Sequence, residues 1–97
     1  MDLDPYVVDV LMPDLVGHDR QPSAFLVYLF LSRRASEGGV ELTLRQIAEG
    51  TGLSKRAVQS AIARLEARAL LEVRRGGITQ PARYRPLRPW RRTRGRP

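Results

Sequence analysis

Cysteine is absent from this 97-residue chain, and lysine and histidine occur once each. The lack of cysteine excludes a disulfide scaffold, a thiolate metal site and a cysteine nucleophile. Long apolar runs are also lacking: the longest, residues 24–31, is far shorter than the ~20 residues of a membrane helix. The N-terminus is acidic where a secretory signal would be basic. We therefore expect a soluble, cytoplasmic protein that does not associate with membranes.

Groups for catalysis or metal binding are equally scarce. His18 is the one histidine, and no residue at metal-ligand or catalytic spacing accompanies it. We interpret it as a turn residue. The acidic residues near the N-terminus, with no accompanying Glu-x-Lys or histidine pattern, are interpreted as a solvated face that avoids DNA: Asp2, Asp4, Asp9, Asp14 and Asp19. We expect no metal, no cofactor, no catalytic residue and no enzymatic activity.

The charge is divided unevenly between the two halves of the chain. Residues 1–41 hold three arginines against seven acidic residues, a net charge of −4, whereas residues 42–97 hold fourteen basic residues against three glutamates, a net charge of +11. A basic half beside an acidic half is typical of a protein that binds a polyanion. Arginine provides nearly all the positive charge, which favours bidentate contacts with phosphate and guanine.

The chain divides into three segments. Residues 1–20 are an acidic lead-in, in which the β-branched segment 6–12, ending at Pro13, predicts a short strand, and residues 14–19 a turn or brief helical turn. Residues 21–84 form the domain. Residues 85–97 have too few apolar residues to fold alone, and we expect a flexible basic tail.

The domain begins with a long helix. Pro22 suits its first position, and we expect it to run to about Ser36 and to end at Gly38-Gly39. Its centre, residues 24–31, is apolar on every side, so the helix must be covered all round. Part of that cover could be a second subunit, with Phe25, Tyr28 and Phe30 as candidates; alternatively all three belong to the core.

Two further helices follow a short strand at residues 40–42. Thr43 and Gln46 have the spacing of a capping box, which predicts a helix from Leu44 to Gly50. Residues 51–53 form a turn, and Ser54 is the next N-cap. The second helix runs from Lys55 to about Ala69, with a core-facing stripe of Val58, Ile62 and Leu65.

A β-hairpin then closes the domain. Residues 70–75 predict a strand, Gly76-Gly77 a tight turn, and residues 78–84 a return strand that Pro81 restricts to an edge or a bulge. The predicted fold is therefore α+β and mostly α: a winged helix-turn-helix, with a three-helix core and a β-hairpin wing.

Residues 42–73 resemble the winged helix-turn-helix of bacterial regulators such as the MarR and GntR types. With the segment that precedes Pro22, they are also similar to helix-turn-helix domains of plasmid and phage replication proteins. Members of these families usually place glycine before the leucine that starts the wing, where this chain has Ala69. We expect the helix to run on slightly or to end less sharply there.

The residues themselves predict a DNA-reading surface. An α-helix fits the major groove, and the N-terminal part of a recognition helix reaches base edges. Arg56 can bind guanine and Gln59 adenine through paired hydrogen bonds, Ser60 is small enough for close approach, and Ser54 and Lys55 suit phosphate. Further contacts are expected from the supporting helix and the wing: Thr43, Arg45, Arg74, Arg75 and Arg83.

The late-helix arginines, Trp90 and the basic tail each allow more than one interpretation. Arg64 and Arg68 lie late on the recognition helix, where Ser60 or Glu72 is a more suitable partner than DNA. Trp90 is expected to pack on the first helix, in preference to exposure or base stacking. The tail itself could follow phosphates or enter a minor groove.

The leading hypothesis is sequence-specific binding of double-stranded DNA by a homodimer, as a bacterial-type transcriptional regulator associated with the nucleoid. The alternatives are the DNA-binding module of a replication initiator, a winged helix that binds an acidic protein, and RNA binding through the arginine tail.

Overall fold

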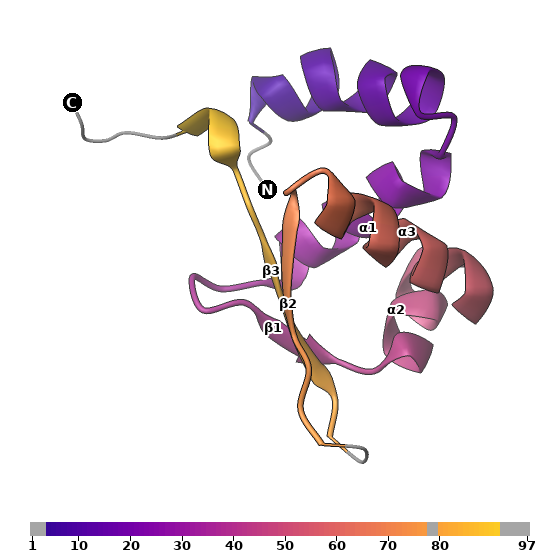
Figure 1. Cartoon of the computed structure of the whole chain (residues 1–97), viewed down its shortest axis with the longest axis vertical. Coiled ribbons are helices and arrows are strands. Elements are labelled where there is room, and N and C mark those ends of the chain that lie inside the picture. The colour runs from indigo at the N-terminus through magenta and orange to yellow at the C-terminus, as the bar shows by residue number, and fades with distance from the viewer. Residues whose placement is uncertain (1–3, 78–79, 92–97) are drawn as a thin grey trace.

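The computed structural model describes residues 4–77 and 80–91 (Figure 1). Its elements are two π-helical segments, three α-helices, three strands and a short 3-10 helix. In chain order they are η1 (Val7–Leu11), η2 (Pro13–His18), α1 (Pro22–Arg34), β1 (Val40–Leu42), α2 (Leu44–Thr51), α3 (Lys55–Ala67), β2 (Leu71–Arg74), β3 (Ala82–Pro86) and η3 (Pro89–Arg91). The predicted α+β fold, with helix-turn-helix and β-hairpin, is confirmed.

Helix α1 lies at the centre of the molecule, as its apolar sequence predicts. It packs against η2, α2, α3 and β3. Phe25, Tyr28 and Leu31 are buried, and the Tyr28 hydroxyl donates a hydrogen bond to the Leu87 carbonyl at 2.8 Å. The helix ends at Arg34 rather than at Ser36, because Ala35 is already extended.

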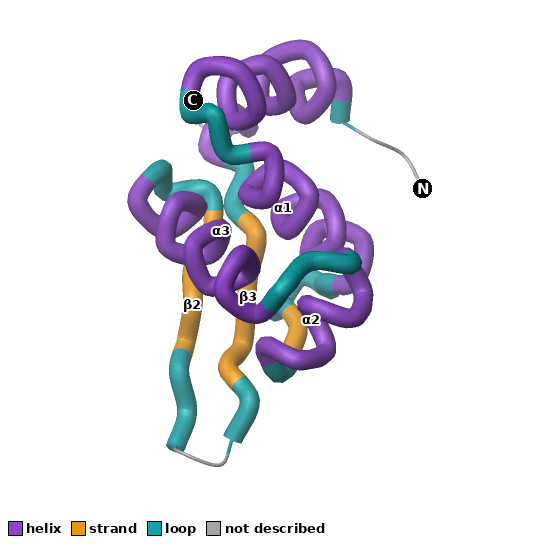
Figure 2. The backbone as a smooth tube through the Cα atoms, turned by 90° about the vertical axis from the view of Figure 1, so that its right-hand side faces the viewer, coloured by secondary structure: helices purple, strands orange, loops and turns teal. Residues whose placement is uncertain are grey.

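The three strands form an antiparallel sheet in the order β1-β3-β2 (Figure 2). Of the two places predicted for the Pro81 strand, an edge or a bulge, the edge is wrong, because β3 is central. Proline cannot donate a ladder hydrogen bond, but Pro81 precedes the first paired residue, Ala82, so it removes no donor from the ladder.

The tight Gly76-Gly77 turn is also not formed. Pairing between β2 and β3 ends at Arg74 and Arg83, so both glycines lie in a longer connection. Within it the Gln80 amide donates to the Gly77 carbonyl at 3.1 Å. Residues 78–79 of the predicted return strand lie outside the described residues.

The predicted N-terminal strand is wrong, because residues 7–18 are helical. Val7, Leu11 and Leu15 recur every fourth residue and are all buried, so one helical face supplies three core side chains. On a strand, Asp9 would share a face with Val7 and Leu11, whereas the helical backbone leaves Asp9 exposed while both apolar side chains are buried. The coiled segments form a layer at one end of the molecule, opposite the tip of the hairpin (Figure 1).

Arg68 fastens this N-terminal layer to the end of α3. Its guanidinium donates to Asp14 Oδ2 at 2.5 Å and to Asp19 Oδ2 at 2.7 Å. The pKa of Asp19 is lowered by its hydrogen bond with His18 and by Arg68. The prediction that Glu72 pairs with Arg68 is wrong, because Glu72 accepts a hydrogen bond from Arg85 at 2.7 Å. These aspartates are therefore structural groups as well as surface charges.

The segment after β3 folds back over the N-terminal layer. The Leu87 amide donates to the Leu70 carbonyl at 2.8 Å. The Trp90 ring stacks on Tyr6 with 4.4 Å between centroids, and its Nε1 donates to Asp4 at 2.9 Å. The aromatic residue that contacts Trp90 therefore lies in the segment before α1 and not on α1 itself. Residues 92–97 of the predicted tail lie outside the described residues.

Within the described ranges, no helix combines the length and apolarity that crossing a membrane requires.

Candidate nucleic-acid interface

Two N-caps and one left-handed glycine set the geometry of the helix-turn-helix. The capping box predicted for α2 is present: Thr43 Oγ1 accepts from the Gln46 amide at 3.1 Å, and Gln46 Oε1 accepts from the Thr43 amide at 2.8 Å. Gly52 ends α2 with φ of +80°, a conformation that glycine adopts without strain. Ser54 then caps α3 by accepting from the Ala57 amide at 3.0 Å.

A close approach between helices fixes α2 against α1. Phe30 lies where a Cβ on Gly50 would be, so only glycine allows this contact. The guanidinium of Arg34 lies over the Phe30 ring, 4.7 Å from its centroid. Phe30 is therefore held within the domain, which stabilises the orientation of α2 relative to the core.

A groove of about 620 Å³ separates α3 from the hairpin, and the start of α2 closes one end. Its lining includes five of the residues that the sequence analysis selects, which come from all three elements: Thr43, Arg45, Lys55, Gln59 and Arg75. Tyr84 is buried at the groove, and burial raises the pKa of its hydroxyl. The structure thus brings together residues that are up to 32 positions apart in the sequence.

The outer side of α3 carries the rest of the proposed reading surface. Val58, Ala61 and Leu65 face the core, so the helical repeat leaves Arg56 and Ser60 exposed on the opposite side. Within residues 4–77 and 80–91, neither Lys55 nor Arg56 forms an ion pair or side-chain hydrogen bond. Both cations are therefore available to an anionic ligand.

Besides Lys55, two other cations line the groove, and both are paired with carboxylates. Arg45 donates to Glu49 at 3.0 Å along α2. Arg75 makes two hydrogen bonds with Glu66, at 3.2 and 3.3 Å, between the hairpin and α3. The hydrogen bonds with Glu66 raise the pKa of the Arg75 guanidinium.

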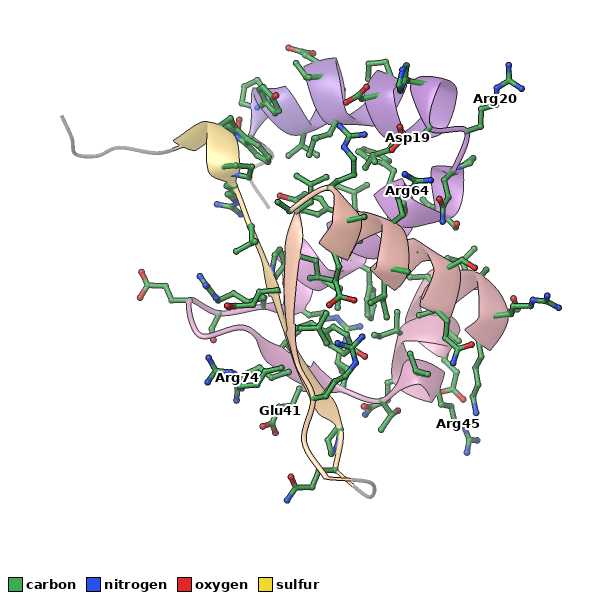
Figure 3. The ribbon with its side chains drawn as sticks, viewed as in Figure 1. Asp19, Arg20, Glu41, Arg45, Arg64 and Arg74 are labelled. Atoms are coloured by element: carbon green, nitrogen blue, oxygen red, sulfur yellow. The ribbon has the colours of Figure 1, made fainter. Side chains whose placement is uncertain are left out.

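Arg74 and Arg83 are not part of this groove. They are cross-strand partners, and alternation along the strands places them on the outer face of the sheet. Arg83 donates to the Gly38 carbonyl at 2.8 Å and lies 3.5 Å from a Glu41 carboxylate oxygen. Figure 3 shows Arg74 and Arg45 pointing to opposite sides of the molecule.

The sequence did not lead us to include Glu66 among the residues of this site. Glu66 lines the groove and lies on the same side of α3 as Lys55 and Gln59, eleven and seven residues after them, which is about three and two helical turns. The periodicity that identifies the reading face could therefore have included it. The pairing of Glu66 with Arg75 depends on how the hairpin folds back, and no local pattern indicates it.

The remaining late-helix arginine also has an unexpected partner. Arg64 Nε donates to Gln21 Oε1 at 3.3 Å, at the start of α1, rather than to Ser60. Figure 3 shows Arg64 on the side of the N-terminal layer, near Asp19. Both Arg64 and Arg68 thus point to the layer and away from the groove.

The three aromatic residues considered for a subunit contact on the first helix are buried or partly buried within the domain. The exposed fractions of Phe25 and Tyr28 are 5% and 1%, so both side chains belong to the core. Phe30 is partly buried against Gly50. All three aromatic side chains therefore pack against residues of the same chain. Among the described residues, the large apolar side chains that are exposed are four in the N-terminal layer and one on α1: Val8, Val10, Met12, Val16 and Leu26.

A capped helix-turn-helix, an exposed cationic second helix and an adjoining hairpin define a winged helix-turn-helix protein. The model of the helix-turn-helix domain family matches residues 21–71, which is more than half of the chain. The chain belongs to this family of DNA-binding domains. No curated protein and no solved structure matches it.

Proposed function

We propose that this protein binds double-stranded DNA sequence-specifically and acts as a bacterial-type transcriptional regulator. The observation that carries the proposal is the uncovered side of α3, where the side chains of Lys55, Arg56 and Gln59 have no partner among residues 4–77 and 80–91 and adjoin the groove. Guanidinium and amide side chains at the start of a recognition helix are the groups that read guanine and adenine in the major groove. The proposal requires no cofactor, metal or catalytic group.

A homodimer is part of this proposal. One recognition helix reads few base pairs, and helix-turn-helix proteins commonly bind two half-sites about one helical turn apart. Selection of bound duplexes from a random pool would reveal the target. We expect a two-fold symmetric sequence. An asymmetric single half-site would contradict the dimer while leaving DNA recognition intact.

Arg56→Ala tests the reading surface. We expect specific binding to weaken by about 1–3 kcal/mol and the preference at one base position to relax, because a bidentate contact with a base is lost. Fluorescence anisotropy with the selected duplex and single-base variants measures both effects.

Arg74→Ala is the matched control, since it removes the same charge from the outer face of the sheet. We expect it to leave base preference unchanged and to alter affinity far less. Equal losses in the two variants would show that α3 is not the reading element. Competition by polyglutamate as effective as by duplex would favour the alternative function, binding of an acidic protein.

A further inference from the structure

The cations that line the groove are not equivalent. Lys55 has no ionic partner within the described part of the chain, whereas Arg45 and Arg75 each contact a glutamate. Arg45 and Glu49 lie one turn apart on α2, and their side chains are 76% and 65% exposed. Such a pair is solvated and contributes little. The Arg75 pair differs because it connects two elements across the groove.

Glu66 meets Arg75 in a two-point contact. The Arg75 Nη2 and Nη1 atoms lie 3.2 and 3.3 Å from Glu66 Oε1 and Oε2, so both carboxylate oxygens are used. The Glu66 side chain is only 35% exposed. The same fork of guanidinium hydrogens is what a phosphate group would bind. A phosphate and Glu66 therefore compete for one set of donors.

We propose that Glu66 is a built-in competitor of DNA: a duplex binds the wing only by displacing this carboxylate from Arg75. The inference rests on the proposed DNA-binding function and adds a residue that limits affinity. Glu66 reduces binding because it occupies the Arg75 donors before DNA arrives.

The contact is suited to such competition because it is weak. A partly exposed ion pair of this kind changes affinity by at most about fivefold, so phosphate can replace it. The exchange costs affinity equally on any sequence, because phosphate contacts carry no base information. Glu66 would thus oppose binding in general, while Arg56 and Gln59 retain the choice of sequence.

Glu66→Gln tests the proposal, since glutamine keeps the size of the side chain and removes its charge. We expect binding of every duplex to become about three- to fivefold tighter. The slope of log affinity against log salt concentration should stay nearly unchanged, because Arg75 contacts one phosphate in both proteins. Glu72→Gln is the matched control: it removes the same charge from a pair with Arg85 on the outer face of the sheet. We expect the control to change affinity by less than about twofold, because Glu72 lies outside the groove.

A second comparison isolates the route through Arg75. In an Arg75→Gln background, the additional Glu66→Gln change should have no more effect than Glu72→Gln. The proposal is overturned if Glu66→Gln matches the control, if it weakens binding, or if its effect persists without Arg75. If the wild-type protein binds no duplex at all, the proposed function itself is wrong; if it binds but the two glutamine variants agree, only the competitor role is lost.

Discussion

Ala69 adopts a backbone conformation that is unusual for alanine. Its φ is +57°, in the left-handed region that normally favours glycine. The turn reverses the chain between α3, which ends at Ala67, and β2, which begins at Leu71. The expectation that α3 runs on because glycine is missing is therefore wrong. Packing of α3 and β2 imposes the left-handed turn on alanine despite its Cβ.

Ala69→Gly should stabilise the protein by about 0.5–1 kcal/mol. Relief of the left-handed conformation exceeds the extra entropy that glycine has in the unfolded chain. Ala67→Gly is the control, because Ala67 lies within the last turn of α3 and should lose about 0.5–1 kcal/mol. Urea denaturation measures both changes. A loss of stability in both variants would mean that Ala69 is not strained.

At the scale of elements, the N-terminal layer is the part that lies outside the matched family segment, which begins at residue 21. It contributes Val7, Leu11 and Leu15 to the core. Its polar attachment is the contact of Arg68 with Asp14 and Asp19. The layer therefore supports the end of α3 that is remote from the reading residues.

This attachment should make stability depend on pH. Because the pKa of Asp19 is lowered in the folded state, by His18 first and Arg68 next, its charged form favours folding. Its contribution is complete above the unfolded pKa of about 3.9 and is lost as the pH falls through the folded pKa. Asp19→Asn should thus be less stable than the wild type at pH 7, with the difference closing in acid.

Urea denaturation between pH 7 and pH 3 measures this difference. Asp9→Asn is the control, since Asp9 is exposed and has no ion pair within the described residues. It should follow the wild-type curve throughout. A difference between Asp19→Asn and the wild type that stays constant down to pH 3 would contradict the role of the Asp19 charge.

On the scale of the whole molecule, the aspartates of the N-terminal layer and the cations of the groove lie toward opposite ends. Asp9, Asp14 and Asp19 belong to the N-terminal layer, whereas the groove with Arg45 and Lys55 lies toward the other end (Figures 1 and 3). Arg68 offsets the charge of Asp14 and Asp19, whereas Lys55 and Arg56 have no ionic partner within the described residues, so a polyanion is attracted more strongly to the groove end. The separation therefore favours one orientation of approach.

The salt dependence of DNA binding should report how many cations take part. Per protomer, we expect Arg45, Lys55 and Arg75 to give a slope of about −3 in a plot of log affinity against log salt, at about −0.9 per phosphate. Anisotropy titrations from low to moderate salt measure it. A slope near zero would exclude phosphate binding by the groove, and a much steeper one would extend the interface to other basic surfaces.

The sequence by itself determined the helix-turn-helix. The capping box at Thr43, the Ser54 cap and the Val58–Leu65 stripe are local signals, because caps and helical periodicity depend on residues only a few positions apart. They predicted α2, α3 and the exposed side of α3 correctly. The spacing of four between Val7, Leu11 and Leu15 is also compatible with the N-terminal helices. The β-branched composition of this segment indicated a strand instead.

Tertiary structure decided the features that depend on distant contacts. It made β3 the central strand, turned Arg74 and Arg83 away from the groove, and joined Arg68 to aspartates about fifty positions earlier. It also placed Glu66 beside Arg75. These outcomes follow from how separate elements pack, and the long-range contacts that fix this packing have no local signature in the sequence.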